Sequence, residues 1–282
     1  MKKQITYILV LFALIGFNAC RTVVDWELPN SEPALVVEGQ ISNVEEFWSV
    51  QLTMTQGYFD SSLPTAVSDA TVVITDDMGG RDTLFHVADG VYEANTKRKC
   101  EVGHQYTLNI SHAGKDYFAT ETLRDQLPFD TVGAVYNPGI AGFADAGYYL
   151  VEIAQESEAV GDYYQWKVYQ NDTLLDDFYI LDSDEFADFS YFNRNFDISQ
   201  ATEDNLPRPF PYLMELGDTV VLEQMCISKN YFDFLFDIET QRNKAGSPFD
   251  APPANPISNI SNGAFGYFSV VNKISAEIVV VE

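Results

Sequence analysis

Three histidines are the side chains in this sequence best suited to bind a transition metal. His86, His104 and His112 all lie in the first half of the chain. On one extended strand, His104 and His112 would stand about 26 Å apart at ~3.3 Å per residue, which is too far for one ion. His104 follows Gly103 and His112 lies two residues before Gly114, at positions typical of turns. His104 and His112 are therefore predicted to be exposed turn residues, and no metal is expected there.

The stretch from Asp172 to Asp188 contains seven acidic residues and no basic one. Its second half could offer oxygen ligands to Ca²⁺ from one loop, through Asp182, Asp184, Glu185 and Asp188. The stretch lacks the glycine and the closing glutamate of an EF-hand loop. A solvated acidic loop is the favoured interpretation, and a calcium site is the alternative.

Aromatic residues make up 14% of the chain and gather at residues 163–166 and 178–196. Exposed rings stack on sugars or grip peptides, whereas alternating rings on strands first of all pack against neighbouring strands. Packing is the favoured interpretation. If the chain has a ligand-binding face, the sequence predicts it at Trp166, Tyr179, Phe189, Tyr191 and Phe192, with Arg194 as a positive handle.

Recognisable catalytic motifs are absent from the sequence. It contains no G-x-S-x-G, H-E-x-x-H, G-x-x-x-x-G-K or G-x-G-x-x-G. The 42 acidic residues could always provide a carboxylate pair for glycoside hydrolysis, but such a pair is recognised by its separation in space. We therefore expect a protein without enzymatic activity or cofactor, with a carboxylate-dependent hydrolase as a less favoured alternative.

The first 19 residues resemble a bacterial lipoprotein signal peptide. They begin with two lysines, continue through an apolar run from Ile5 to Phe17, and end at Ala19 before Cys20. That run is short for a membrane span. Cleavage before Cys20 would leave a lipidated cysteine as membrane anchor. An ordinary secretory peptide cut near Ala19, or an uncleaved anchor, is the alternative, and each of these exports the chain.

Composition excludes some partners and permits a disulfide. The net charge of −26 becomes −28 without residues 1–19, because Lys2 and Lys3 are lost, and such a chain repels nucleic acid and anionic lipid headgroups. Cys100 and Cys226 could form one disulfide in an exported protein, and two buried free thiols are the alternative.

The elements that would position these residues are mainly strands. From Ala34 to Leu123 the pattern has a period of two, as in Trp48, Val50 and Leu52, with frequent turn signals. After an anchor linker at residues 20–33, residues 34–127 are therefore predicted to form an immunoglobulin-like or transthyretin-like β-sandwich.

Residues 128–282 are predicted to form a second β-rich domain. Its clearest hairpin turns at Asn171-Asp172. One amphipathic helix is expected near residues 229–245, capped by Ser228, with an apolar face for packing. The final stretch, residues 267–281, is strand-rich and looks too long to be one unbroken strand.

Several segments together resemble one known family, the Bacteroidota lipoproteins of domain-of-unknown-function family 4249. The segments that carry the resemblance are Asp25 to Pro29, Pro33 to Ile41, Val67 to Asp77, Asp89 to Tyr92, Gly103 to Leu108, Gly246 to Phe249, Asn255-Pro256, Asn259-Ile260 and Gly263 to Phe268. The resemblance covers nearly the whole chain after Cys20. The resemblance implies no reaction and no catalytic residues. Because members of the family tend to be encoded beside TonB-dependent outer-membrane receptors, it implies such a receptor as a partner.

The sequence and the resemblance together favour an outer-membrane lipoprotein that binds a ligand for a TonB-dependent receptor, or that forms part of the receptor's assembly. A surface adhesin-like or structural module is the alternative. The side of the outer membrane that the protein faces, the ligand and the oligomeric state are left open.

Overall fold

A computed structural model describes residues 32–57, 60, 62–125, 129–139, 146–154, 161–184, 192–196, 214–242 and 254–282. Cys20 and the predicted signal peptide lie outside these ranges. The chain divides into two compact units, Met1–Glu32 with Gly57–Ser61 and Pro33–Gln56 with Ser62–Glu282, and every element named below belongs to the second unit.

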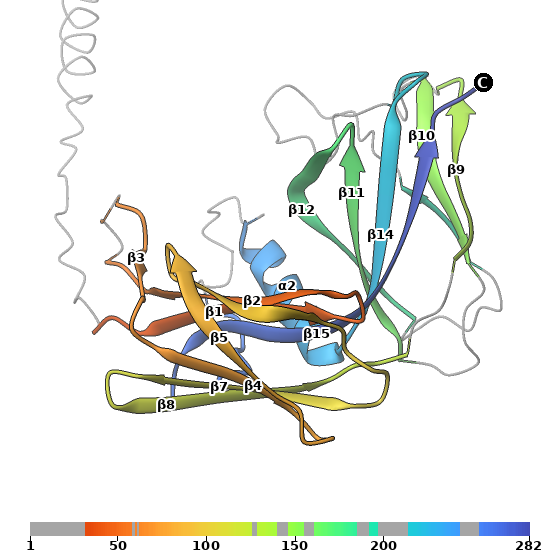
Figure 1. The fold of residues 1–282 in the computed structure, drawn as a ribbon. Coiled ribbons are helices and arrows are strands. Elements are labelled where there is room, and N and C mark those ends of the chain that lie inside the picture. Colours follow the sequence, from red (N-terminus) through yellow and green to blue (C-terminus); the bar gives the residue numbers. More distant parts are fainter. Residues whose placement is uncertain are drawn as a thin grey trace, which may run out of the picture. The chain divides into compact units, whose positions relative to one another are not determined.

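The fold is mainly β, as predicted, and its first part is a two-layered sandwich (Figure 1). Inward residues of β1 and β2 share one core with those of β4, β7 and β8, and the Trp48 ring meets the Tyr106 ring edge-on at 5.8 Å. The predicted alternation along β2 is confirmed, because Trp48, Val50 and Leu52 are all buried. The strands are β1 Leu35–Ser42, β2 Glu46–Met54, β3 Thr65–Ala66, β4 Thr71–Asp76, β5 Arg81–Ala88, β6 Val91–Arg98, β7 Gln105–His112 and β8 Lys115–Thr122.

The second part contains seven strands and a helix in the described residues. Strands β12, β11, β14 and β15 lie side by side, and β13, β10 and β9 form a separate three-stranded sheet. A second core, which includes Leu150, Tyr164 and Leu222, lies between the two sheets. The elements are β9 Phe129–Asn137, β10 Gly147–Ala154, β11 Tyr163–Gln170, β12 Thr173–Ser183, β13 Phe192–Phe196, β14 Thr219–Ile227, α2 Lys229–Arg242 and β15 Phe265–Val279.

Strand β15 corrects one expectation. The C-terminal stretch does form a single strand, of 15 residues, although its length argued against one. It can be this long because it has two successive partners: Phe265 to Val271 pair in parallel with β1, and Asn272 to Val279 pair antiparallel with β14. Residues 265–271, which lie in the predicted second domain, thus extend the sheet of the sandwich beside β1. The predicted boundary between residues 127 and 128 stays a prediction.

Two backbone features explain local sequence choices. Asn171 and Asp172 both have positive φ, at 48° and 63°, so the predicted tight turn between β11 and β12 is confirmed. Gly266 has a φ of +85°, and a Cβ there would lie 2.0 Å from the carbonyl oxygen of Val37. Only glycine allows β15 to approach β1 this closely.

The predicted helix is also confirmed, as α2. The Ser228 hydroxyl accepts a hydrogen bond from the backbone N–H of Tyr231 at 3.2 Å, which is the expected N-cap. Within the described residues, no helix is long and apolar enough to cross a membrane.

Candidate functional site

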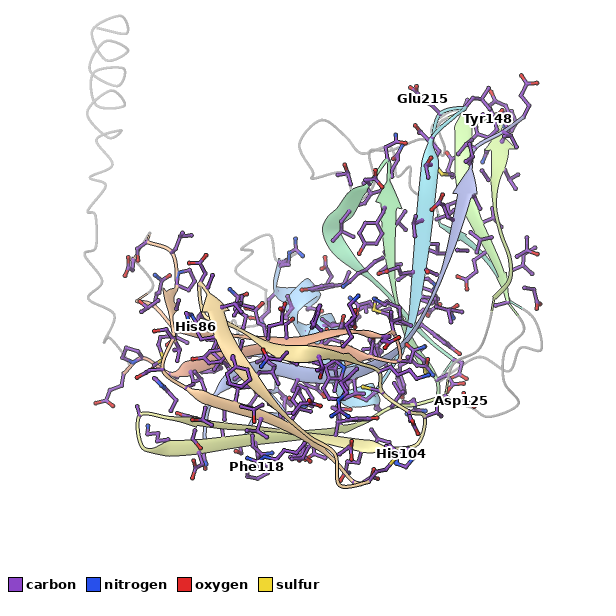
Figure 2. The ribbon with its side chains drawn as sticks, viewed as in Figure 1. His86, His104, Phe118, Asp125, Tyr148 and Glu215 are labelled. Atoms are coloured by element: carbon purple, nitrogen blue, oxygen red, sulfur yellow. The ribbon has the colours of Figure 1, made fainter. Side chains whose placement is uncertain are left out.

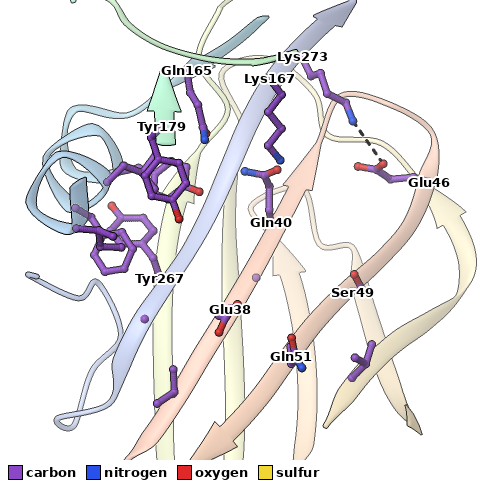
Figure 3. A pocket seen from close by; sticks show the side chains of 18 of the residues that line it. Glu38, Gln40, Glu46, Ser49, Gln51, Gln165, Lys167, Tyr179, Tyr267 and Lys273 are labelled. Atoms are coloured by element: carbon purple, nitrogen blue, oxygen red, sulfur yellow. Dashed lines mark ion pairs between the residues drawn. The ribbon is translucent and has the colours of Figure 1, made fainter. Parts of the chain in front are cut away.

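A groove of about 780 Å³ lies where α2 faces the sheet (Figure 3). This volume is in the range of small-molecule sites in proteins. Six strands and the helix contribute lining residues: Val36, Glu38, Gly39, Gln40, Glu46, Phe47, Ser49, Gln51, Val91, Gln165, Lys167, Tyr179, Tyr231, Phe234, Leu235, Ile238, Gly266, Tyr267 and Lys273.

The floor of the groove is polar because of the alternation in β1 and β2. Inward residues such as Val37 and Val50 fill the sandwich core, so their neighbours point the opposite way. Those neighbours include Glu38, Gln40 and Ser49, which line the groove. The floor thus presents a carboxylate, an amide and a hydroxyl, which are groups that orient a polar ligand.

The wall of the groove is aromatic. The Tyr231 and Phe234 rings on α2 lie 4.9 Å and 5.0 Å from the Tyr267 ring on β15. The Tyr179 ring on β12 completes the wall, with the Arg242 guanidinium 6.0 Å from its centroid. These rings offer flat apolar surface to a ligand.

Hydrogen bonds between floor and wall hold the groove in shape. The Gln40 amide donates to the Ser269 hydroxyl at 3.3 Å. Burial raises the pKa of Tyr231 to about 12, although hydrogen bonds to Ser269 and Gln40 act in the opposite direction. The Tyr231 hydroxyl is therefore neutral and fixed between helix and sheet.

At one end of the groove, a lysine pairs with two carboxylates. The Lys273 ammonium lies 3.9 Å from a carboxylate oxygen of Glu46 and 3.7 Å from one of Glu223. Glu223 also accepts a hydrogen bond from the Tyr169 hydroxyl at 3.3 Å. Lys273 is thus fully engaged by carboxylates of the protein itself.

Lys167 differs from Lys273. Its ammonium has no hydrogen bond or ion pair with any residue in the described part of the chain. Its pKa is lowered, first by burial and then by the charge of Lys273, whereas the charges of Glu223 and Glu46 oppose this shift. A charged group that has lost water without gaining a partner is poised to bind an anion.

The residues of the predicted ligand face do not come together in the described structure. Tyr179 lines the groove, but Trp166 is 2% exposed and belongs to the core on the other side of β11. Phe192 and Arg194 belong to β13, in the three-stranded sheet. Phe189 and Tyr191 lie outside the described residues.

The calcium candidates are only partly described. The buried Asp184 carboxylate accepts hydrogen bonds from the backbone N–H groups of Gly161 and Asp162, at 2.6 Å and 2.7 Å. That of Asp182 accepts one from the Ser183 N–H at 2.8 Å. Glu185 and Asp188 lie outside the described residues. Among the residues that are described, no three acidic, histidine or cysteine side chains gather as a metal site.

The histidines and cysteines take separate places in the fold. Figure 2 shows His86 and His104 well apart, and His104 bonds the Asp77 carboxylate at 2.8 Å. Cys100 and Cys226 are buried free thiols in two different cores, so the alternative to a disulfide holds. Burial raises the pKa of each thiol to about 12.

Sequence reasoning missed most of the groove. The apolar face of α2 was predicted to pack, and Leu235 does so, but Tyr231, Phe234 and Ile238 also form the wall. The polar residues that alternate with the core residues of β1 carried the only signal, and any solvent-facing strand has that pattern.

The fold and the groove define a mainly β protein with a ligand-sized groove between its helix and its sheet. Residues 21–277 match DUF4249, a domain of unknown function, and the chain belongs to that family. No curated protein matches the chain. A solved structure titled "Biofilm associated protein - BSP domain" is similar at 12% identity and a TM-score of 0.23, and the match covers 89% of this chain and 29% of that one. The chain thus spans less than a third of that protein.

Proposed function

We propose that this protein is a lipid-anchored, non-enzymatic binding protein of the outer membrane, which holds a small ligand in the groove for a TonB-dependent receptor. The observation that carries the proposal is the groove itself, with its polar floor, its aromatic wall and the unpaired Lys167. These features suit recognition of a polar molecule that has an apolar part.

The sequence, together with the family resemblance, supports the lipid anchor and the receptor in this proposal. Cys20 follows a segment that resembles a lipoprotein signal, and the family match begins at the next residue. Two or more acyl chains on Cys20 would hold the protein at a membrane. The resemblance to lipoproteins encoded beside uptake receptors supports such a receptor as the partner.

Binding in the groove is tested with the mature lipoprotein purified from its own membranes. We expect native mass spectrometry to show a retained small molecule. Ser49→Trp should abolish retention, because an indole on the floor fills the groove. The matched control is Thr122→Trp, on an exposed face of β8 away from the groove. Equal retention by both variants would contradict binding in the groove.

The receptor is tested by crosslinking and pull-down from the same membranes, with Cys20→Ala as the control. A TonB-dependent receptor recovered only with the lipidated protein is the expected result. If anchoring is confirmed and no receptor is recovered, the receptor part of the proposal fails, and a free-standing surface module becomes the better description.

A further inference from the structure

The groove contains two opposite charges that have no partner in the described structure. Four charged residues line it, and two of these, Glu46 and Lys273, pair with each other. The other two are Lys167 and Glu38, and neither side chain makes a hydrogen bond or ion pair with a described residue. They are not within ion-pair distance of each other either. Lys167 is half-buried and Glu38 is exposed, so a ligand in the groove can pair with both.

The separation between these charges suits a short molecule. Glu38 and Gln40 are neighbours on the same face of β1, about 6.6 Å apart along the strand. Figure 3 shows the Lys167 side chain pointing toward Gln40. Both unpaired charges therefore face the same short stretch of the groove, since Gln40 is one strand repeat along β1 from Glu38.

A third group in the groove also lacks a partner. Gln165 is 2% exposed and lines the groove, and its Oε1 accepts no hydrogen bond from the described residues. A buried amide oxygen without a donor is costly, and an N–H group of a ligand would relieve that cost.

We propose that the ligand is a short zwitterionic peptide, whose free carboxylate binds Lys167 and whose free ammonium binds Glu38. Its backbone amides bond Gln165 and the floor, and an apolar side chain lies on the rings of Tyr179 and Phe234. This identification rests on the proposed binding function of the groove.

The charge of the whole protein supports a zwitterion over an anion. At a net charge of −26, the protein repels a ligand with several carboxylates before contact. A purely cationic ligand would be attracted, but it would leave Lys167 unpaired and add a second positive charge beside it. A peptide with free termini has no net charge and satisfies both residues.

The test measures the affinity of the purified mature protein for three probes by calorimetry. The probes are the tripeptide Ala-Phe-Ala with free termini, its C-terminal amide and its N-acetyl form. A charge-assisted hydrogen bond predicts that the wild type binds the free tripeptide about tenfold or more tightly than either blocked form.

Two variants assign the termini. Lys167→Met keeps the length of the side chain but removes its charge, so it should bring the ratio between free and amidated peptide to about one. Glu38→Gln should do the same for the ratio between free and acetylated peptide. Lys115→Met, at the exposed first residue of β8, is the control and should change neither ratio.

The failure of this proposal is distinguishable from failure of the proposed function. If the three probes bind equally well or not at all, while Ser49→Trp still abolishes retention of the native ligand, the zwitterionic peptide is refuted and groove binding stands. If Ser49→Trp also leaves retention unchanged, both fail. Unchanged ratios in Lys167→Met and Glu38→Gln would equally overturn the assignment of the two termini.

Discussion

Replacing Gly266 by alanine tests whether β15 approaches β1 as closely as described. Gly266 has a φ of +85°, and a new Cβ would lie 2.0 Å from the Val37 carbonyl oxygen and 2.8 Å from its carbonyl carbon. Both atoms belong to the backbone, so no side-chain rotation can relieve the contact. The two strands must move apart, which weakens the parallel pairing from Val36 to Ser42.

The expected magnitude has two parts. An alanine held in a left-handed conformation costs about 1–2 kcal/mol. Separation of the strands adds lost hydrogen bonds and lost packing of Phe268, so we expect the unfolding free energy to fall by about 3 kcal/mol or more.

Gly263 is the matched control for this substitution. It lies three residues earlier, with a φ of +75°, and a Cβ there would meet no atom within 4 Å. Gly263→Ala should therefore show only the conformational cost, about 1–2 kcal/mol. Urea unfolding followed by circular dichroism measures both variants. Equal losses of stability in the two variants would refute the close approach at Gly266.

Three further predictions concern buried or capping groups. Burial raises the pKa of Glu121 above 4.5, against hydrogen bonds from Tyr267 and Ser228, so the folded state binds a proton more readily than the unfolded state. Wild type should therefore lose stability relative to Glu121→Gln as pH rises from about 4.5. The loss is about 1.4 kcal/mol per unit of difference between the folded-state and unfolded-state pKa of Glu121. Paired urea titrations measure it, and a constant difference across pH would contradict this. Ser228→Ala should lower the unfolding free energy by about 1 kcal/mol through loss of the N-cap, and an unchanged urea midpoint would count against that cap. Cys100 and Cys226 should resist a thiol reagent in the native state at pH 8 and both react in urea, because they are buried with a pKa of about 12; rapid native labelling would disprove their burial.

Local signals in the sequence predicted the strands well. Trp48 and its alternating neighbours, the Asn171-Asp172 turn and the Ser228 cap each depend on a few adjacent residues, and each is found as predicted. Such features follow from the backbone preferences and side-chain pattern of the segment itself.

The groove could not be predicted in the same way, because it is built from distant segments. In the sequence, Glu38 and Lys167 are indistinguishable from other polar residues that alternate with core residues in a strand. Only the pairing of β15 with both β1 and β14 brings their two strands into one sheet. The aromatic clusters were misleading for a related reason. Trp166 and Tyr179 both come from aromatic-rich segments, but they lie on opposite faces of the sheet.

The position of β15 in the chain sets the order in which the protein can be completed. Side chains on β1 and in the following turn bond β15 residues about 230 positions later, as when the Asn43 amide donates to the Lys273 carbonyl. During synthesis, the edge of β1 that pairs with β15 therefore stays unpaired until nearly the whole chain has been made. Any product that ends before Phe265 lacks the strand that joins the two halves, and it exposes that edge to aggregation or proteolysis. Under the proposed function, only molecules that contain β15 would bind the ligand, so truncated products would be inactive.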